Sequence, residues 1–236
     1  MPNKKLLAAF AAGMMLSSAA AKAESLSVWT GADVAPNSYF AYLGGVAALS
    51  GQAIEREDGF LFRFGGGYGE YHYDTVAVST GRVDANLTAG ELMLGYSFFF
   101  ANGSLGVYMG GNAERHDASP VDSGNSVRGT AGGLKGSADL KLTPMQNVSL
   151  GASGSYSSAF DSYWTHLDAG YDFGPFSFGP EATFLGNEGF NQSRFGAAIS
   201  NVDIGFAMLR LYGGYAENRS RGADGFYAGF GLGADF

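Results

Sequence analysis

Three side chains in the second half of the chain are of the types that cleave esters. Ser162, His166 and Asp168 lie within seven residues of one another, and a serine nucleophile, a histidine base and an orienting aspartate are the groups a hydrolase needs. A lipid-cleaving barrel enzyme is therefore one interpretation. Serine is abundant in this stretch, however, and Ser162 and His166 lie near one strand end. A polar network without catalysis is the interpretation that we prefer.

Nothing else in the chain has the spacing of a catalytic or metal-binding group. The chain has three histidines and no cysteine, and neither a His-x-x-x-His pair nor a calcium-binding loop occurs. The glycine run at residues 65–69 lies within a predicted strand with no helix after it, so it is not a phosphate loop. We expect no metal, no cofactor and no enzymatic activity.

The start of the chain has the three parts of a secretory signal peptide. Lys4 and Lys5 precede an apolar stretch at residues 6–16, and Ala-Lys-Ala at 21–23 is a cleavage site. We expect residues 1–23 to be removed and residues 24–236 to form the mature domain. Loss of three lysines leaves 11 basic against 22 acidic residues, a net charge of about −11. That charge argues against a nucleic-acid partner.

The end of the chain has the pattern of a membrane strand. Large apolar residues alternate with glycine and polar residues from Phe226 to Phe236, which suits a barrel with lipid outside and water inside. A terminal aromatic residue is also typical of outer-membrane proteins, whose assembly machinery reads the last strand. We expect Phe230, Leu232 and Phe236 to carry this assembly signal, and the protein to lie in the outer membrane.

The same alternation recurs along the mature chain and predicts an all-β fold. We expect a transmembrane antiparallel up-and-down β-barrel of about 12 strands, with 10 or 14 also compatible. The predicted strands are 25–35, 39–50, 59–73, 83–99, 103–115, 127–143, 148–160, 163–173, 176–186, 193–201, 205–216 and 225–236. Tight turns alternate with longer polar connections, one of them at residues 186–192. This alternation places the tight turns and both termini in the periplasm. Residues 51–58 are an exception, a longer charged connection predicted to be periplasmic.

Residues 134–142 fix the register of the sixth predicted strand. Leu134, Leu140 and Leu142 share one face, while Lys135 and Lys141 share the other. A lysine on the lipid face costs about 2–4 kcal/mol at the middle of the membrane, so the lysines must face inward.

Two residues fit their strands less well. Glu91 shares the parity of apolar neighbours, which indicates a bulge or a register shift of one, and Pro180 lies inside a strand.

This register predicts a lumen lined by charges of both signs. The candidates are Arg63, Lys135, Asp139, Lys141, His166, Asp168, Glu181, Arg194 and Arg210. They would form either a polar channel lining or a salt-bridged plug. Aromatic residues at the predicted strand ends suit membrane girdles. Tyr163 and Trp164 are candidate glucan contacts, since their rings can stack on sugars, although a girdle role is the more common one.

Several segments resemble the BcsS family, outer-membrane-type proteins associated with cellulose biosynthesis in alphaproteobacteria. They are GGGYGEYHY at 65–73, VRGTAGGLKGSADLKLTP at 127–144, SYSSAFDSYW at 155–164, GPEATFLGNEGFNQSRF at 179–195 and RGADGFYAGFGLGADF at 221–236. They occur in the same order over most of residues 60–236. The resemblance implies a place in a cellulose-producing system but supplies no catalytic residues.

We therefore expect an accessory protein that aids the export or surface assembly of the glucan. Its expected partners are outer-membrane lipid, the barrel assembly machinery, cellulose and periplasmic cellulose-export components. The alternatives are a small general porin or solute channel and a lipid-modifying barrel enzyme. A third is a passive anchor for periplasmic partners that dock on residues 51–58.

Overall fold

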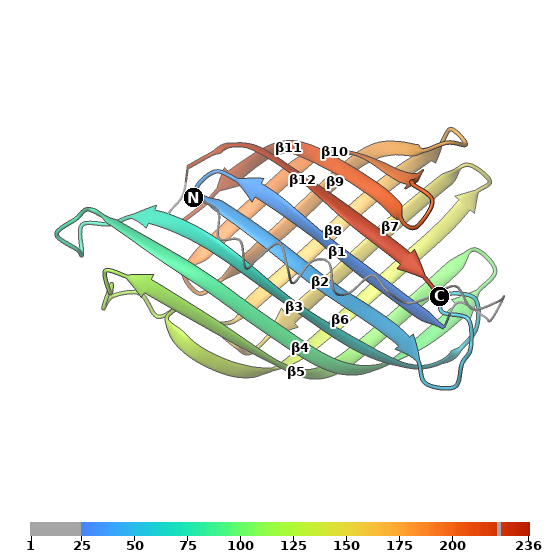
Figure 1. Ribbon diagram of the computed structural model, residues 1–236, viewed down its shortest axis with the longest axis horizontal. Helices are drawn as coiled ribbons and strands as arrows, with labels where there is room; N and C mark the ends of the chain where they lie inside the picture. Colours follow the sequence, from blue (N-terminus) through green and yellow to red (C-terminus); the bar gives the residue numbers. More distant parts are fainter. Residues whose placement is uncertain (1–24, 221–222) are drawn as a thin grey trace.

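Alternating side chains organise the described residues, 25–220 and 223–236, into twelve strands in the computed structural model (Figure 1). The predicted signal peptide, residues 1–23, lies outside these residues. The strands are β1 (Leu26–Ala35), β2 (Ser38–Ala48), β3 (Gly59–Asp74), β4 (Arg82–Phe100), β5 (Gly103–Ser119), β6 (Gly129–Met145), β7 (Val148–Ser157), β8 (Ser162–Asp172), β9 (Ser177–Asn187), β10 (Phe190–Asp203), β11 (Met208–Asn218) and β12 (Gly225–Asp235).

The twelve strands close into one antiparallel barrel. Each strand pairs with its neighbours in sequence, and β1 pairs with β12 from Ser27 opposite Asp235 to Val34 opposite Ala228. The backbone N–H of Phe236 donates to the carbonyl of Leu26, which fastens the last residue to the first strand. The predicted up-and-down barrel of 12 strands is confirmed. In the described part of the chain, no helix is long and apolar enough to cross a membrane.

The two ends of the barrel differ. The Phe236 end holds Phe236 and the connections β2–β3, β4–β5, β6–β7, β8–β9 and β10–β11, and the loop end holds the other six connections. β3 to β6 are the longest strands, and the β3–β4 hairpin reaches furthest at the loop end (Figure 1). The predicted long connection at 186–192 is instead a tight turn at Glu188 and Gly189, because β9 and β10 pair up to Asn187 and Phe190.

Side chains of the two parities face opposite sides of the wall. On β6, Leu134 is 75% exposed on the outer face, while Lys135 and Asp139 on the inner face form ion pairs with other strands. The inner face also carries flat aromatic rings over glycines. The Trp29 ring covers Gly44, and the Tyr212 ring covers Gly229. Any larger residue than glycine there would displace the ring, so glycine lets large aromatics lie flat inside the wall.

The structure corrects two expectations about irregular residues. β3 and β4 pair without interruption from Gly59 opposite Ser97 to Asp74 opposite Arg82, so Glu91 does not lie at a bulge. The second alternative, a register shift of one, holds, because the face expected for the apolar residues around Glu91 was wrong by one residue. Glu91 faces inward beside Met93, and the apolar inner face of β4 is the reason its parity was misleading. Pro180 pairs opposite Ala197 in unbroken register with β10, so it is not a bulge either.

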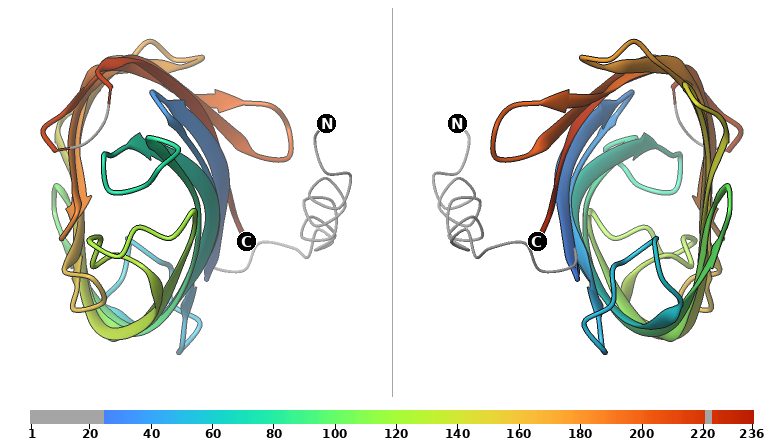
Figure 2. Two further views of the ribbon diagram at one scale, coloured as in Figure 1. Left: turned by 90° about the vertical axis from the view of Figure 1, so that its left-hand side faces the viewer. Right: turned by 90° about the vertical axis from the view of Figure 1, so that its right-hand side faces the viewer.

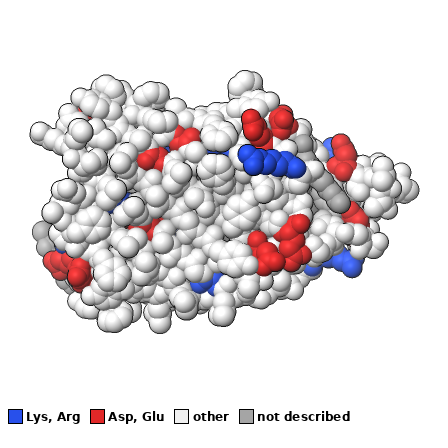
Figure 3. Space-filling model, turned by 180° about the vertical axis from the view of Figure 1, so that it is seen from behind, with Lys and Arg blue, Asp and Glu red and all other residues white. Residues whose placement is uncertain are grey.

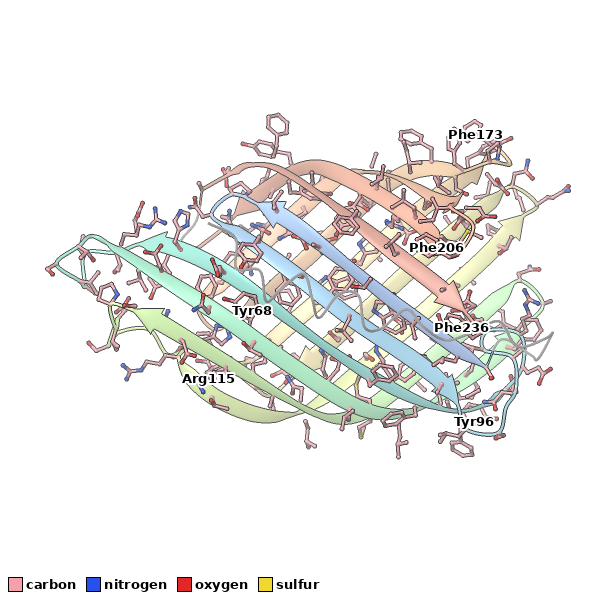
Figure 4. The ribbon with its side chains drawn as sticks, in the orientation of Figure 1. Tyr68, Tyr96, Arg115, Phe173, Phe206 and Phe236 are labelled. Carbon is pink, nitrogen blue, oxygen red and sulfur yellow. The ribbon has the colours of Figure 1, made fainter. Side chains whose placement is uncertain are left out.

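The outer face is apolar around its middle and aromatic near the Phe236 end. Large side chains such as Leu94, Met109 and Phe195 are exposed there. Tyr96, Phe173, Phe206 and Phe236 project near the Phe236 end, with Tyr68 and Arg115 further towards the loop end (Figure 4). Seen from behind, most charged side chains gather towards the loop end, and the middle is mainly uncharged (Figure 3).

Candidate functional site

The inner wall carries two groups of ion-paired side chains, and the first joins three strands. The Arg63 guanidinium on β3 lies 2.6 Å from Asp139 Oδ2 on β6 and 3.3 Å from Glu91 Oε1 on β4. The Lys135 ammonium donates to the other oxygen of Glu91. We call these four residues the first ion cluster. Because β3 and β6 are not neighbours, the cluster links strands that the sheet itself leaves unpaired.

The second ion cluster lies on the other side of the barrel, on β1 and β8 to β12. Arg194 pairs with Asp33 at 2.7 Å, and Arg210 pairs with Glu181 at 2.7 Å. The Tyr227 hydroxyl donates to Glu181 at 2.8 Å and its ring lies under Arg194. The cluster consists of Asp33, His166, Asp168, Glu181, Arg194, Arg210 and Tyr227. Its charges are largely balanced within the cluster.

Eight of the nine predicted lumen residues belong to these two clusters. The exception is Lys141, whose ammonium lies 2.6 Å from Glu55 of the β2–β3 connection, at the Phe236 end. Three members were not predicted from the sequence: the charged residues Glu91 and Asp33, and Tyr227. Asp33 has the parity of Trp29 and Gly31, opposite to Val34, so alternation could have identified it. Alternation could not have identified Glu91, because the nearest other residues on its inward face are apolar.

The three groups of the candidate hydrolase do not come together as a catalytic site. The Ser162 hydroxyl donates to Glu114 on β5 at 2.7 Å. His166 is engaged elsewhere, with Nδ1 2.9 Å from the Thr183 hydroxyl and Nε2 3.2 Å from the Arg210 guanidinium. A serine nucleophile needs a base within hydrogen-bond reach. Ser162 instead contacts the Glu114 carboxylate, which also accepts a hydrogen bond from Asn112. Within residues 25–220 and 223–236, no cluster of histidines and carboxylates suits a metal ion.

The two sides of the inner wall differ in their contact with solvent. Between β2 and β5, Val46, Leu61, Met93 and Tyr108 form a buried apolar cluster, and Leu61 and Met93 are each 1% exposed. On β6, β8 and β11 the inward side chains of the two ion clusters retain between 18% and 29% exposure. The residues of β7 between them are small, with Ser149, Gly151, Ser153 and Ser155 facing inward. Water therefore reaches the wall formed by β6 to β8, which we call the hydrated wall.

Trp164 and Tyr163 point in opposite directions. Trp164 has the inward parity of His166, and the two rings stack with centroids 5.8 Å apart and planes at 10°. It is 39% exposed, and that exposure is to the lumen. Tyr163 lies on the outer face with Leu167 and Tyr171, where a membrane girdle is expected. A girdle role therefore does not suit Trp164, because its ring is not on the outer face.

Both ends of the barrel are partly covered by inward-folded connections (Figure 2). At the Phe236 end, residues 49–58 fold back so that Gln52 and Ala53 are buried and Ile54 packs on the apolar cluster. At the loop end, residues 120–128 fold into the mouth. There the Tyr73 hydroxyl donates to Asp122 at 3.3 Å and accepts from Asn125 at 2.9 Å, with Val127 buried. Residues 120–128 thus form a cover, anchored on β3.

Removal of the Tyr73 hydroxyl is expected to loosen this cover. Tyr73→Phe leaves the ring in place but removes two hydrogen bonds to residues 120–128, each contributing about 1 kcal/mol. Trypsin should then cut after Arg128 several times faster in the folded protein. Tyr39→Phe is a matched control, because Tyr39 lies on the outer face and does not contact the cover. Equal cleavage rates in Tyr73→Phe and the unaltered protein would contradict an anchoring role.

A cavity of about 440 Å³ lies at the loop end, between the cover and two other connections. We call it the mouth cavity. The cover supplies Asn125 to it, the β9–β10 turn supplies Asn187 and Glu188, and the β11–β12 connection supplies Ser220. The described residues that line the mouth cavity are Gly124, Asn125, Ser126, Asn187, Glu188, Gly189, Phe190, Asn191 and Ser220. The lining is polar and mostly uncharged.

Comparison with known proteins places the fold in context. A family described as cellulose biosynthesis protein BcsS matches residues 27–236. No curated protein sequence matches the chain. Among solved structures, the KdgM porin is 8% identical with a TM-score of 0.45, over 89% of this chain and 99% of that one. The transport unit of the autotransporter AIDA-I from Escherichia coli is 12% identical with a TM-score of 0.48, over 97% and 95%. At such identities, these likenesses say nothing about function.

Proposed function

Because the chain belongs to the cellulose biosynthesis protein BcsS family, we propose that it is an outer-membrane barrel that assists the export or surface assembly of cellulose. The family match extends over residues 27–236, which is the whole barrel, and this is the observation that carries the proposal. The chain's own residues would act by holding a glucan or an export partner, without a covalent step.

The outer surface supports the membrane location. Leu94, Met109 and Leu134 are each more than 60% exposed on the outer face, and a water-soluble protein rarely exposes so large an apolar area. The closed sheet leaves no unpaired edge, as a spanning barrel requires. We place the Phe236 end in the periplasm, with lipid around the apolar middle. Removal of residues 1–23 by a signal peptidase is part of the same proposal.

Two further partners follow from this location. The barrel assembly machinery would recognise the last strand through Phe230, Leu232 and Phe236, of which Phe230 and Phe236 are exposed on the outer face. Periplasmic export components would meet the Phe236 end. There, residues 49–58 lie against the barrel mouth and present Glu55 and Arg56 to solvent, so they offer a surface rather than a projecting arm.

A small porin or solute channel is the second candidate, and the hydrated wall is the observation that favours it. Partly exposed ionic side chains along β6 and β8 are compatible with a water path. The porin interpretation predicts conductance in planar bilayers and normal cellulose in a deletion strain. The cellulose interpretation predicts an altered amount or location of the polymer.

The deciding experiment is a clean deletion of the gene in a cellulose-producing host. Surface and periplasmic glucan are measured separately, and the restored gene serves as the control. Loss of surface glucan with periplasmic accumulation would support export, and loss of organised surface fibres at normal total glucan would support surface assembly. An unchanged amount and location would refute the cellulose role and leave the porin candidate.

A further inference from the structure

We propose that the loop end of the barrel contains a binding site for a neutral oligosaccharide, formed by the mouth cavity and Trp164. The site would give the proposed cellulose role a ligand, and so it rests on that role. Trp164 is an aromatic residue that faces the lumen and keeps 39% of its surface exposed. A large apolar ring is costly to leave in water without a partner.

Trp164 lies one inward-facing position along the wall from the mouth cavity. Trp164 pairs opposite Leu185 on β9, and Asn187, two residues further along β9 with the same inward parity, lines the cavity. The carbonyl of Phe160, which precedes β8, accepts the backbone N–H of Glu188 at 3.0 Å, so the two segments are fastened together. A ligand that extends inward from the cavity would therefore next reach the level of Leu185 and Trp164.

The position of Trp164 is held by its neighbours. Its ring stacks on His166, whose two nitrogens are engaged by Thr183 and Arg210. One face of the indole is thus supported by His166, and the 39% of the residue that is exposed is accessible to a ligand. Ligand sites commonly join an aromatic platform of this kind to a few polar groups that fix orientation. Sugars suit the combination, since their C–H faces are apolar and their hydroxyls are polar.

The charges around the site favour a neutral ligand over an ionic one. The first ion cluster holds two positive and two negative side chains that neutralise one another. Arg194 and Arg210 of the second cluster each have a carboxylate partner. Of the described residues that line the mouth cavity, Glu188 is the only charged one. An anionic polymer would find no cation among these described lining residues. The amides of Asn125, Asn187 and Asn191 and the hydroxyl of Ser220 can exchange hydrogen bonds with neutral hydroxyls.

The chain is suited to a direct test because it has two tryptophans. Trp29→Phe keeps a ring beside Arg63 and leaves Trp164 as the sole indole, so that its fluorescence reports on the site. Cellohexaose, maltohexaose and trigalacturonate would be titrated into this variant of the full barrel in detergent micelles. We expect a saturable change in intensity or wavelength with a neutral hexasaccharide and none with trigalacturonate.

Two substitutions at neighbouring residues locate the site. In the otherwise unaltered protein, Trp164→Leu should weaken calorimetric binding about tenfold, as expected for one aromatic stacking contact. Tyr163→Leu, which alters the outer face one residue away, should leave the affinity unchanged. Asn191→Leu changes the cavity lining without touching the stacked rings and should also weaken binding. Slow migration of unheated samples on gels, a mark of folded barrels, is required of every variant.

The experiments distinguish a failure of this binding site from a failure of the proposed cellulose role. Absence of binding by both hexasaccharides, binding of trigalacturonate alone, or loss of binding in Tyr163→Leu but not Trp164→Leu would overturn the site. None of these results bears on cellulose export, which the deletion strain tests by itself. Binding in vitro together with unchanged cellulose in the deletion strain would keep the site and reject the cellulose role. A preference for cellohexaose over maltohexaose would support both.

Discussion

Replacing Glu91 by glutamine is expected to lower the free energy of unfolding by about 2 kcal/mol, between the values for breaking an exposed and a fully buried ion pair. Glu91 is the only anion in contact with Lys135 among the described ion pairs, and it also contacts Arg63. Its side chain is 15% exposed. Removal of its charge leaves Lys135 in the lumen without a counter-charge, while Arg63 keeps Asp139. Urea unfolding of the barrel in lipid vesicles, followed by circular dichroism, measures the change.

A second substitution identifies the cause of that loss. Glu91→Gln combined with Lys135→Met removes one anion and the cation it balances, and should recover most of the lost stability. Asp117→Asn, which breaks an exposed pair with Arg115, is the control for a surface salt bridge and should leave stability unchanged. If the double variant were as unstable as the sum of its single substitutions, charge balance would not be what holds the first ion cluster.

Ala138→Arg should prevent stable insertion or cost about 2–4 kcal/mol, the penalty for arginine near the middle of the lipid face. Ala138 lies near the centre of β6, opposite Val107 on β5 and Gly154 on β7, all on the outer face. The consequence depends on lipid, because in water an exposed arginine on a strand is harmless. The measurement is the fraction of folded barrel in vesicles, resolved by gel mobility without heating, and the urea midpoint of that fraction.

The matched variant at the same position is Ala138→Leu, which adds volume without charge and should fold at least as well as the unaltered protein. If Ala138→Arg and Ala138→Leu folded equally in vesicles, the apolar outer face would not be a lipid face. That result would contradict the membrane location while leaving the closed barrel intact. The prediction therefore tests the environment of the barrel and not its topology.

Much of the fold is readable from the chain because strands repeat every two residues. All twelve strands were predicted close to their observed bounds, and the inward direction of Lys135 and Asp139 follows from the cost of placing charge in lipid. The ends of strands were less predictable. Glu188 and Gly189 read as part of a long polar loop, but the pairing of β9 with β10 extends through the polar residues around them.

By itself, the sequence determined the class of fold, an approximate number of strands and the face on which most side chains lie, since these depend on local alternation and on the energy of moving charge into lipid. The closed pairing settled the number at twelve. The tertiary structure alone decided which charges meet. Arg63 and Asp139 are 76 residues apart, and they pair because closure and curvature of the barrel bring β3 and β6 across one inner face. The same closure folds residues 120–128 into the mouth, where Asn125 and Asn187 line one cavity. Local pattern carries no information on such distant contacts.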